Sequence, residues 1–398
     1  MKNKFRFCNC ANKIFEDIYN QNGRAFLVGG IVRDMLMYGH VDYHDVDVEV
    51  YGLSIEQLEN ILKKYGNVNC IGKSFGILKL DVLANYDFAL PRTEIKIGNR
   101  HQDFKVEVNK DLDLKTAALR RDLTVNALMY EVKTGKIYDF YGGIEDLNKR
   151  TLRMVDKKTF EEDPLRVLRV AQFASRFEFF VEAKTKNICK EMVKKGMLKY
   201  LSNERVFQEY NKLLLSNRPS IGLSFLKDIK ALYPCLDVLS STMQRLDYHP
   251  EGDVWKHTLL VTDLAALCRH KTAYPLGFMW GALLHDIGKP EARVEGPDKD
   301  HFKMHPVIGE EIARKILRRL KFDNQTIKQV TTLVRWHDRR FASFEEVNKK
   351  TIRRWVSKLT PELFARLMVV QRADINAQSD YHKEQKEQVL NETKRLFE

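Results

Sequence analysis

The chain has 398 residues, of which 44% are hydrophobic, and this length predicts two to four compact units with ample core for each. Lysine and arginine number 67 against 54 aspartate and glutamate residues, and the net charge of +13 favours a polyanion such as nucleic acid without separating RNA from DNA or a membrane surface. The six scattered cysteines favour reduced thiols over a disulfide framework, and neither a signal peptide nor a membrane span is visible, so we expect a cytoplasmic protein without a membrane partner.

Strand and helix signals are mixed in the first third of the chain. Residues 25–28 form an apolar run typical of a buried strand. Ser54 and Gln57 have the spacing of a capping box that opens an amphipathic helix. Two further strands and a polar hairpin or loop, which contains a Gly98-Asn99 turn, are expected at residues 77–82, 87–90 and 93–105. These signals predict an α/β or α+β catalytic domain.

Acidic residues alternate with valines over residues 45–50, which predicts a strand with its acids, including Asp45 and Asp47, on one face. Carboxylates bind Mg²⁺ together with substrate phosphates, and two such ions can hold the attacking and leaving oxygens of an in-line displacement. A solvated strand face would show the same pattern. However, Gly29 and Gly30 lie a short step upstream, and glycines let backbone N–H groups approach a triphosphate. Together they indicate nucleotidyl transfer.

Two later pairs of polar residues have spacings that suit nucleotide recognition. Asp122 and Asn126 are four apart and would share a helical face from which they could bind a ribose. Asp163 and Arg166 are three apart, at a helix start that tolerates proline. An Asp acceptor beside an Arg donor matches the Watson–Crick edges of cytosine and adenine and opposes those of uracil and guanine. An ordinary surface ion pair is the alternative for Asp163 and Arg166.

Five motifs follow one another in the first half of the chain. They are Gly29-Gly30-x-Val32-Arg33-Asp34, Asp45-x-Asp47, Arg120-Arg121-Asp122-x-Thr124-x-Asn126-Ala127, Gly142-Gly143-x-x-Asp146-Leu147 and Glu162-Asp163-x-x-Arg166-x-x-Arg169. In this order they resemble the class II tRNA nucleotidyltransferase and bacterial poly(A) polymerase family. The resemblance implies a head of the polymerase-β type in which Asp45 and Asp47 bind Mg²⁺ and Asp87 is a further catalytic acid. The nucleotide-binding residues that it implies are Gly29, Gly30, Arg33, Arg121, Asp122, Asn126, Asp163, Arg166 and Arg169.

Histidines and carboxylates recur in the C-terminal half, where the signals are helical. The adjacent pair His285 and Asp286 ends an apolar run just before Gly288, so both side chains could face inward. This segment resembles the HD phosphohydrolase superfamily. The resemblance implies a first metal on His257, His285, Asp286 and Asp374, and a second metal that adds His305 and His337. Such a ligand mix suits a divalent transition metal, namely Mn, Ni, Co or Fe, that would activate water against a phosphate ester.

Two basic helical segments combine an apolar stripe with a cationic face, at residues 184–199 and 312–321. Contact with tRNA phosphates and a merely solvated face are both compatible with this pattern.

We therefore expect an α+β fold with a polymerase-β-type nucleotidyltransferase head at residues 1–150, an all-helical neck and body at 151–225 and a helical HD domain at 226–398. The expected activity is template-independent addition of CCA to the tRNA 3′ end from CTP and ATP, with a metal-dependent phosphohydrolase in the HD domain. CC-only, A-only or poly(A) addition uses the same motifs. A chain that acts chiefly as a phosphohydrolase on phosphate ends is the alternative from another class, and the oligomeric state stays open.

Overall fold

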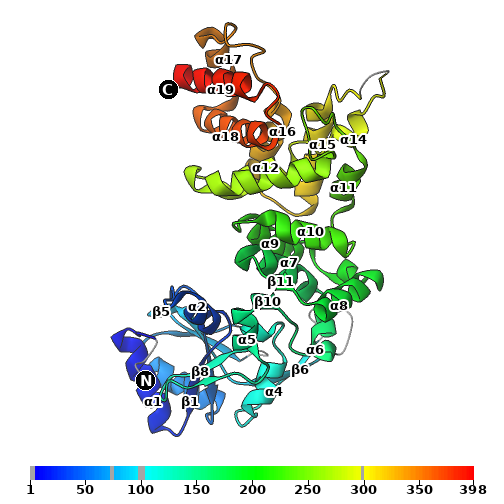
Figure 1. Ribbon diagram of the computed structural model, residues 1–398. Helices are drawn as coiled ribbons and strands as arrows, with labels where there is room; N and C mark the ends of the chain where they lie inside the picture. Colours follow the sequence, from blue (N-terminus) through cyan, green and yellow to red (C-terminus); the bar gives the residue numbers. More distant parts are fainter. Residues whose placement is uncertain (1–4, 72–75, 97–103, 297–299) are drawn as a thin grey trace. The chain divides into compact units, whose positions relative to one another are not determined.

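The computed structural model describes residues 5–71, 76–96, 104–296 and 300–398 (Figure 1). The chain divides into two compact units, and each is described here by itself. The first consists of Met1–Arg166 and Phe179–Leu201, and the second of Val167–Glu178 and Ser202–Glu398. Across the described ranges, no helix has both the length and the apolar character that a membrane crossing requires.

A seven-stranded sheet forms the centre of the first unit, in the order β3-β4-β5-β2-β1-β8-β9. The pair β2 and β5 is parallel, and the other neighbours are antiparallel. The strands of this sheet are β1 (Arg24–Val28), β2 (Val46–Tyr51), β3 (Val68–Ile71), β4 (Ile77–Leu80), β5 (Leu83–Ala89), β8 (Met129–Glu131) and β9 (Ile137–Tyr138). Two separate pairs are formed by β6 (Arg92–Lys96) with β7 (Phe104–Val108) and by β10 (Thr151–Leu152) with β11 (Phe180–Val181).

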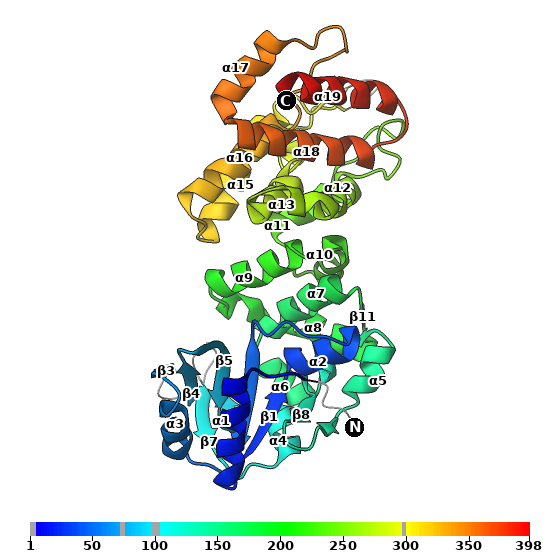
Figure 2. The same cartoon turned by 90° about the vertical axis from the view of Figure 1, so that its left-hand side faces the viewer.

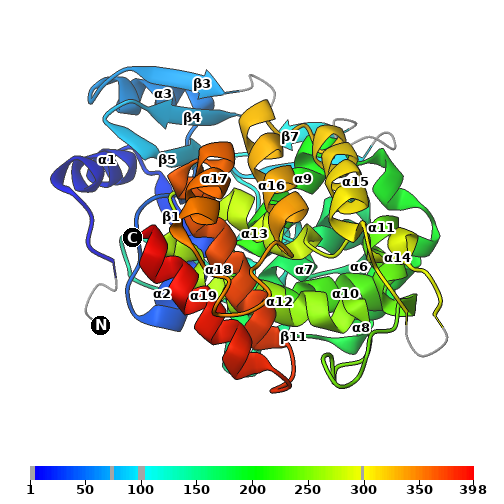
Figure 3. The same ribbon diagram turned by 90° about the horizontal axis from the view of Figure 1, so that it is seen from above.

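Helices pack on this sheet and complete the core of the first unit. Figure 3 shows α1 and α3 beside the strands β3, β4 and β5. The three valines of β2 are at most 1% exposed, as their alternation with acids predicts. The helices of this unit are α1 (Asn9–Asn20), α2 (Gly30–Tyr38), α3 (Ile55–Lys63), α4 (Leu114–Leu119), η1 (Thr124–Asn126), α5 (Gly143–Asn148), α6 (Lys157–Glu162), α8 (Ala183–Lys194) and η2 (Met197–Tyr200).

The elements expected in this part of the chain are largely confirmed. The capping box before α3 is present, because Ser54 Oγ accepts from the Gln57 amide at 3.2 Å and Gln57 Oε1 accepts from the Ser54 amide at 2.8 Å. The expected strands are found as β1, β4 and β5, and the polar segment forms the antiparallel pair β6 and β7. The expected turn at Gly98 and Asn99 lies outside the described residues.

The second unit is helical over its described residues, apart from isolated bridges. Helix α13 is apolar on all sides and lies among α12, α16 and α18 (Figure 2). The helices of this unit are α7 (Leu165–Phe177, whose first two residues belong to the first unit), α9 (Asn203–Leu214), α10 (Pro219–Asp228), α11 (Pro234–Asp237), η3 (Val238–Ser241), α12 (Val254–Cys268), η4 (Arg269–Lys271), α13 (Pro275–Leu284), α14 (Lys289–Ala292), α15 (His305–Arg319), α16 (Asn324–Trp336), α17 (Lys349–Leu359), α18 (Pro361–Ala377) and α19 (Lys383–Phe397). The expected α+β class with a helical C-terminal part is confirmed over the described residues.

Candidate active site and metal centre

Carboxylates converge on the parallel strand pair β2 and β5, in the middle of the first unit's sheet. The register places Asp47 of β2 opposite Asp87 of β5, and Asp45 lies just before β2. Asp47 and Asp87 line an open pocket of about 120 Å³. Partial withdrawal from bulk water raises the pKa of Asp47; Arg121 opposes this rise, and the carboxylates of Asp45 and Asp87 add to it. This oxygen-rich donor set fits a hard divalent cation.

Asp87 has a cationic partner of its own. Lys79 Nζ lies 2.8 Å from Asp87 Oδ1, and the two residues face each other across the β4–β5 pair. The structure therefore places Asp87 beside Asp47, while its expected catalytic role stays a prediction.

Glu49, the second acid of β2, does not face solvent. It is 3% exposed and accepts from Arg120 at 2.5 Å and from Arg121 at 3.0 Å. Burial opposes its ionisation, but these two arginines lower the pKa of Glu49 below its ordinary value. Glu49 therefore fixes the arginines at the pocket wall.

Gly29 meets two independent requirements of this pocket. Its φ of +76° is a backbone conformation that side chains rarely adopt. A Cβ at this position would also lie 3.0 Å from Arg121 Nη1 and 3.7 Å from Asp47 Oδ2. Gly30 then begins helix α2, so the turn brings open backbone N–H groups beside the carboxylates.

Asp122 and Asn126 lie together, although their segment is not an α-helix. Residues Thr124–Asn126 form the short 3₁₀ helix η1, and Asn126 Nδ2 donates directly to Asp122 Oδ1 at 3.0 Å. Arg33 Nη1 donates to Asn126 Oδ1 at 2.5 Å, and all three side chains are buried. Arg33 thus supports Asn126 from α2, while the nucleotide-binding roles of these residues stay predictions.

The Gly142-Gly143 motif begins helix α5, which packs against η1, a role that the sequence did not indicate. A Cβ on Gly143 would lie only 2.3 Å from the carbonyl oxygen of Thr124. Asp146, on the same helix α5, accepts from Thr124 Oγ1 at 2.6 Å and forms an ion pair with Arg153. The helix therefore packs directly against the turn that carries Asn126.

Asp163 and Arg166 lie at the start of α7, as their spacing predicted. Asp163 Oδ1 accepts from the amide of Leu165 at 3.0 Å. The Arg166 guanidinium donates to the carbonyls of Thr159 at 2.8 Å and Arg120 at 2.5 Å. Arg166 is thereby tied to a segment that lines the carboxylate pocket.

Arg169 lies farther along α7, in the part assigned to the second unit. Its guanidinium carbon is 5.0 Å from the centre of the Phe173 ring. The structure therefore assigns Arg166 and Arg169 to different units of the chain, and the nucleotide-binding role expected for Arg169 stays a prediction.

The six expected ligands of the HD region come together in the second unit. Asp286 lies between two groups: its Oδ2 is 3.2 Å from His285 Nε2, and its Oδ1 is 3.4 Å from His305 Nε2 and 3.4 Å from His337 Nε2. On the other side, His257 Nε2 is 3.0 Å from an oxygen of Asp374. All six side chains are buried, and they come from α12, the end of α13, the start of α15, the end of α16 and α18. Three triads could each hold an ion. Two consist of expected ligands, namely His257, His285 and Asp374, and Asp286, His305 and His337, and the third consists of His249, Glu251 and His257.

Main-chain carbonyls orient three of the four imidazoles. The Nδ1 atoms of His285, His305 and His337 donate to carbonyl oxygens at 2.7–2.8 Å. Each ring therefore turns Nε2 toward the centre. His285 Nε2 is buried and has no hydrogen-bond partner among the described residues, which fits a metal ligand rather than a satisfied core histidine.

Cations surround the two carboxylates of the centre. Lys289 Nζ is 2.7 Å from Asp286, and Arg340 forms an ion pair with Asp374. Although burial opposes ionisation, His285 and Lys289 hold the pKa of Asp286 well below its ordinary value, and Arg340 with His257 does the same for Asp374.

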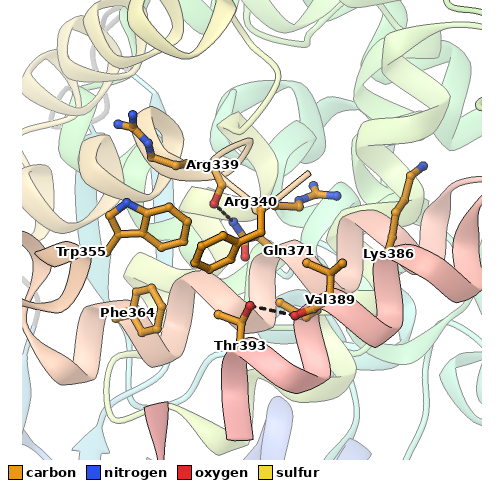
Figure 4. Close-up of a pocket in the computed structure, with 10 residues that line it drawn as sticks. Arg339, Arg340, Trp355, Phe364, Gln371, Lys386, Val389 and Thr393 are labelled. Atoms are coloured by element: carbon orange, nitrogen blue, oxygen red, sulfur yellow. Dashed lines mark hydrogen bonds between the residues drawn. The ribbon is translucent and has the colours of Figure 1, made fainter. Parts of the chain in front are cut away.

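Gln371 fixes the turn that connects His337 to Arg340. Its amide donates to the carbonyls of His337 and Arg339 at 3.1 and 2.9 Å. The neighbouring cavity, lined by Trp355 and Phe364 (Figure 4), measures about 10 Å³ and has room for one water at most. It is therefore a packing gap rather than a ligand site.

Comparison with known proteins identifies the family. Residues 25–153 match the "Poly A polymerase head domain", residues 178–241 the "Probable RNA and SrmB- binding site of polymerase A" and residues 254–376 the "HD domain". The multifunctional CCA protein of Aliivibrio salmonicida is 35% identical over 364 residues, 88% of this chain and 84% of that protein. That of Pasteurella multocida is 33% identical over 369 residues, 90% and 85% of the two chains. The chain belongs to the multifunctional CCA protein family.

Solved structures with lower sequence identity share the fold. A tRNA nucleotidyltransferase complexed with a primer tRNA and an incoming ATP analog has a TM-score of 0.66 at 19% identity, covering 96% of this chain and 99% of that one. The Bacillus stearothermophilus CCA-adding enzyme in complex with CTP has a TM-score of 0.65 at 19% identity, with coverages of 98% and 83%. The predicted family is thus confirmed: this chain is a nucleotidyltransferase of the CCA-adding type that also carries an HD domain.

Proposed function

We propose that the head adds C, C and A to the 3′ end of tRNA, taking CTP and ATP as donors and releasing pyrophosphate. The pairing of Asp47 with Asp87, beside the Gly29 turn and Arg121, carries this proposal. The carboxylates would hold Mg²⁺, which supplies charge neutralisation for the phosphates when bound. The Gly29–Gly30 turn and Arg121 would orient the triphosphate with its α-phosphate toward Asp47.

The transfer itself requires little covalent chemistry from the protein. The terminal 3′ oxygen of tRNA forms a bond to the α-phosphorus and loses its proton, while the bond between the α-phosphorus and the bridging oxygen breaks. Pyrophosphate leaves with that oxygen. The side chains around the pocket therefore act by positioning and by charge stabilisation.

Base selection is assigned to Asp163 and Arg166 in this proposal. Their carboxylate and guanidinium present an acceptor beside a donor, which suits cytosine and adenine. In the structure Arg166 donates to main-chain carbonyls and Asp163 accepts from a main-chain amide. Both side chains lie at the start of one helix. A bound base would replace some of these hydrogen bonds.

The substitution Asp47→Asn tests the head. We expect it to reduce addition to tRNA lacking its 3′ CCA by a factor on the order of 100 or more, because a neutral amide is a poor ligand for Mg²⁺. Products from each nucleotide mixture are sequenced, which separates CCA addition from CC-only, A-only and poly(A) addition. Addition at the wild-type rate by a folded Asp47→Asn protein would refute the proposal.

A second activity is supported by the buried histidine and carboxylate centre. We propose that it holds a divalent transition metal such as Mn, Ni, Co or Fe, and hydrolyses a phosphate ester, with 2′,3′-cyclic and other phosphate ends as test substrates. His285→Ala is expected to abolish hydrolysis and keep nucleotide addition, and Asp47→Asn to do the converse. Loss of both activities in one folded variant would contradict two separate sites.

A further inference from the structure

One imidazole of the metal centre is held differently from the other three. His285, His305 and His337 each donate from Nδ1 to a main-chain carbonyl. His257 instead has its Nδ1 2.8 Å from Oε1 of the Glu251 carboxylate. Glu251 was not among the residues that the sequence motifs indicated, and it comes from a loop rather than from a helix of the centre.

Glu251 is buried and contacts a second imidazole as well. Its side chain is only 8% exposed, and the same Oε1 lies 3.0 Å from His249 Nδ1. The rings of His249 and His257 pack edge to face, with centres 4.6 Å apart. Glu251 Oε2 is buried and has no hydrogen-bond partner in the part of the chain that the structure describes. Burying a carboxylate with one unpaired oxygen costs free energy. We attribute the position of Glu251 to its two imidazole contacts, which offset part of that cost.

The loop that carries Glu251 is fixed at both ends and at its middle. The amide of Val254 donates to Thr242 O at 3.0 Å and closes the loop. In its middle, Tyr248 O accepts from the amide of Ser379 at 2.9 Å, and the Tyr248 ring packs against Tyr381 at 4.9 Å. Ser379 lies two residues after the end of helix α18, which carries the ligand Asp374. The loop is therefore anchored to a ligand-bearing helix and holds Glu251 in one place.

We propose that Glu251 is a positioning residue of the HD metal centre. Its carboxylate accepts the Nδ1–H of His257, fixes the tautomer and ring orientation, and so aims Nε2 at the space shared with Asp374. A carboxylate partner also makes the imidazole a stronger donor to a metal than a carbonyl partner does. This inference rests on the proposed metal binding of the centre.

Cobalt binding to the full-length protein tests the role of Glu251. Protein stripped with a chelator is titrated with Co²⁺, and affinity, stoichiometry and the visible absorption spectrum are recorded. Because outer carboxylates of this kind are worth about 10–100-fold in metal affinity, we expect Glu251→Ala to weaken binding by that factor and to change the spectrum. Glu251→Gln, which keeps an acceptor oxygen without the charge, should fall between Glu251→Ala and the wild type.

Asp247→Asn is the matched control, since Asp247 lies in the same loop but pairs with Arg245 at the surface. It should bind Co²⁺ as the wild type does, and all variants should keep nucleotide addition. Wild-type affinity and spectrum in both Glu251 variants would overturn the positioning role while leaving the metal centre intact. Loss of one bound ion per chain in these variants would mean that Glu251 is itself a metal ligand, and this would also overturn the positioning role. A wild-type protein that binds no Co²⁺ would overturn the metal centre itself.

Discussion

Glu131 on β8 is a buried carboxylate whose partners favour its charged form. It accepts from Arg24 Nε at 2.8 Å, Thr134 Oγ1 at 2.7 Å and Tyr138 OH at 3.1 Å. Burial opposes ionisation, but these bonds lower the pKa of Glu131 below its ordinary value. A depressed folded pKa means that its stabilising contribution is complete above the unfolded pKa of about 4.3 and is lost as pH falls through the folded pKa.

Glu131→Gln should therefore lower the free energy of unfolding at pH 7 by about 1–3 kcal/mol, with a difference from the wild type that shrinks below pH 4.3. Urea unfolding at several pH values measures this. The surface pair of Glu145 and Lys149 provides the control, because Glu145→Gln should change stability little at any pH. A difference that stayed constant from pH 7 to pH 3 would contradict the assignment.

Cysteine reactivity tests burial directly. All six cysteines are free thiols, as the sequence predicted. Cys189 on α8 is fully buried, and burial raises its pKa to about 12, whereas Cys8 and Cys70 are exposed. Iodoacetamide at pH 8 should modify Cys8 and Cys70 in the native protein and reach Cys189 only after unfolding. Peptide mass spectrometry measures this, and equal rates at Cys189 and Cys8 would contradict the packing of α8.

At the level of elements, α5 packs directly against η1, the turn that carries Asn126, one of the residues proposed to bind the nucleotide. Gly143→Ala would place a Cβ 2.3 Å from Thr124 O, so either α5 or the turn with Asn126 must move. We expect a stability loss of about 1–3 kcal/mol and a raised KM for the nucleotide. Gly142→Ala is the control, since a Cβ there meets nothing within 4 Å although its φ of +77° is strained. That variant should lose stability and keep its KM.

Sequence patterns predict the elements whose buried residues recur at a regular spacing or whose ends carry a local capping motif. The valines of β2 and the capping box of α3 follow local rules, and the structure contains both. Asp122 and Asn126 would share a face if their segment were an α-helix, but a side-chain hydrogen bond over a 3₁₀ turn brings the pair together instead. Glu251 had no local signal at all. Its partner His257 is six residues away, and the loop that carries Glu251 is held both by its own backbone hydrogen bonds and by the distant Ser379.

For the whole molecule, the three expected ranges at 1–150, 151–225 and 226–398 stay a prediction. The compact units divide the chain otherwise, since Phe179–Leu201 belongs with the first unit and the boundary falls inside α7. The chain leaves the first unit within α7 and returns to it at Phe179, before α8. The amino-acid composition does not reveal this return, because α7 and α8 are both amphipathic helices. Local patterns therefore locate helices in this region but do not assign them to units.

The excess of positive charge predicts a salt-dependent affinity for tRNA, and α8 provides a local test of it. Lys184, Lys190 and Lys194 are exposed, form no ion pair with any residue that the structure describes, and fall within residues 178–241, which match the RNA-binding family model. Their combined change to Gln should weaken tRNA binding. The slope of log K against log salt should become shallower by roughly one for each phosphate that the variant no longer neutralises. Filter binding between about 50 and 200 mM salt measures both effects. Over this range the affinity of a protein that contacts many phosphates falls about 10³-fold or more.

The control for that experiment removes the same total charge elsewhere. Three exposed lysines that already have glutamate partners, namely Lys63 with Glu59, Lys149 with Glu145 and Lys394 with Glu398, are changed to Gln together. If α8 binds the RNA backbone, this variant keeps the wild-type slope, because a slope counts the counterions released from neutralised phosphates and not the net charge of the protein. Equally weakened binding in both variants would mean that long-range attraction alone draws tRNA to the chain, and unchanged binding in the α8 variant would remove α8 from the interface.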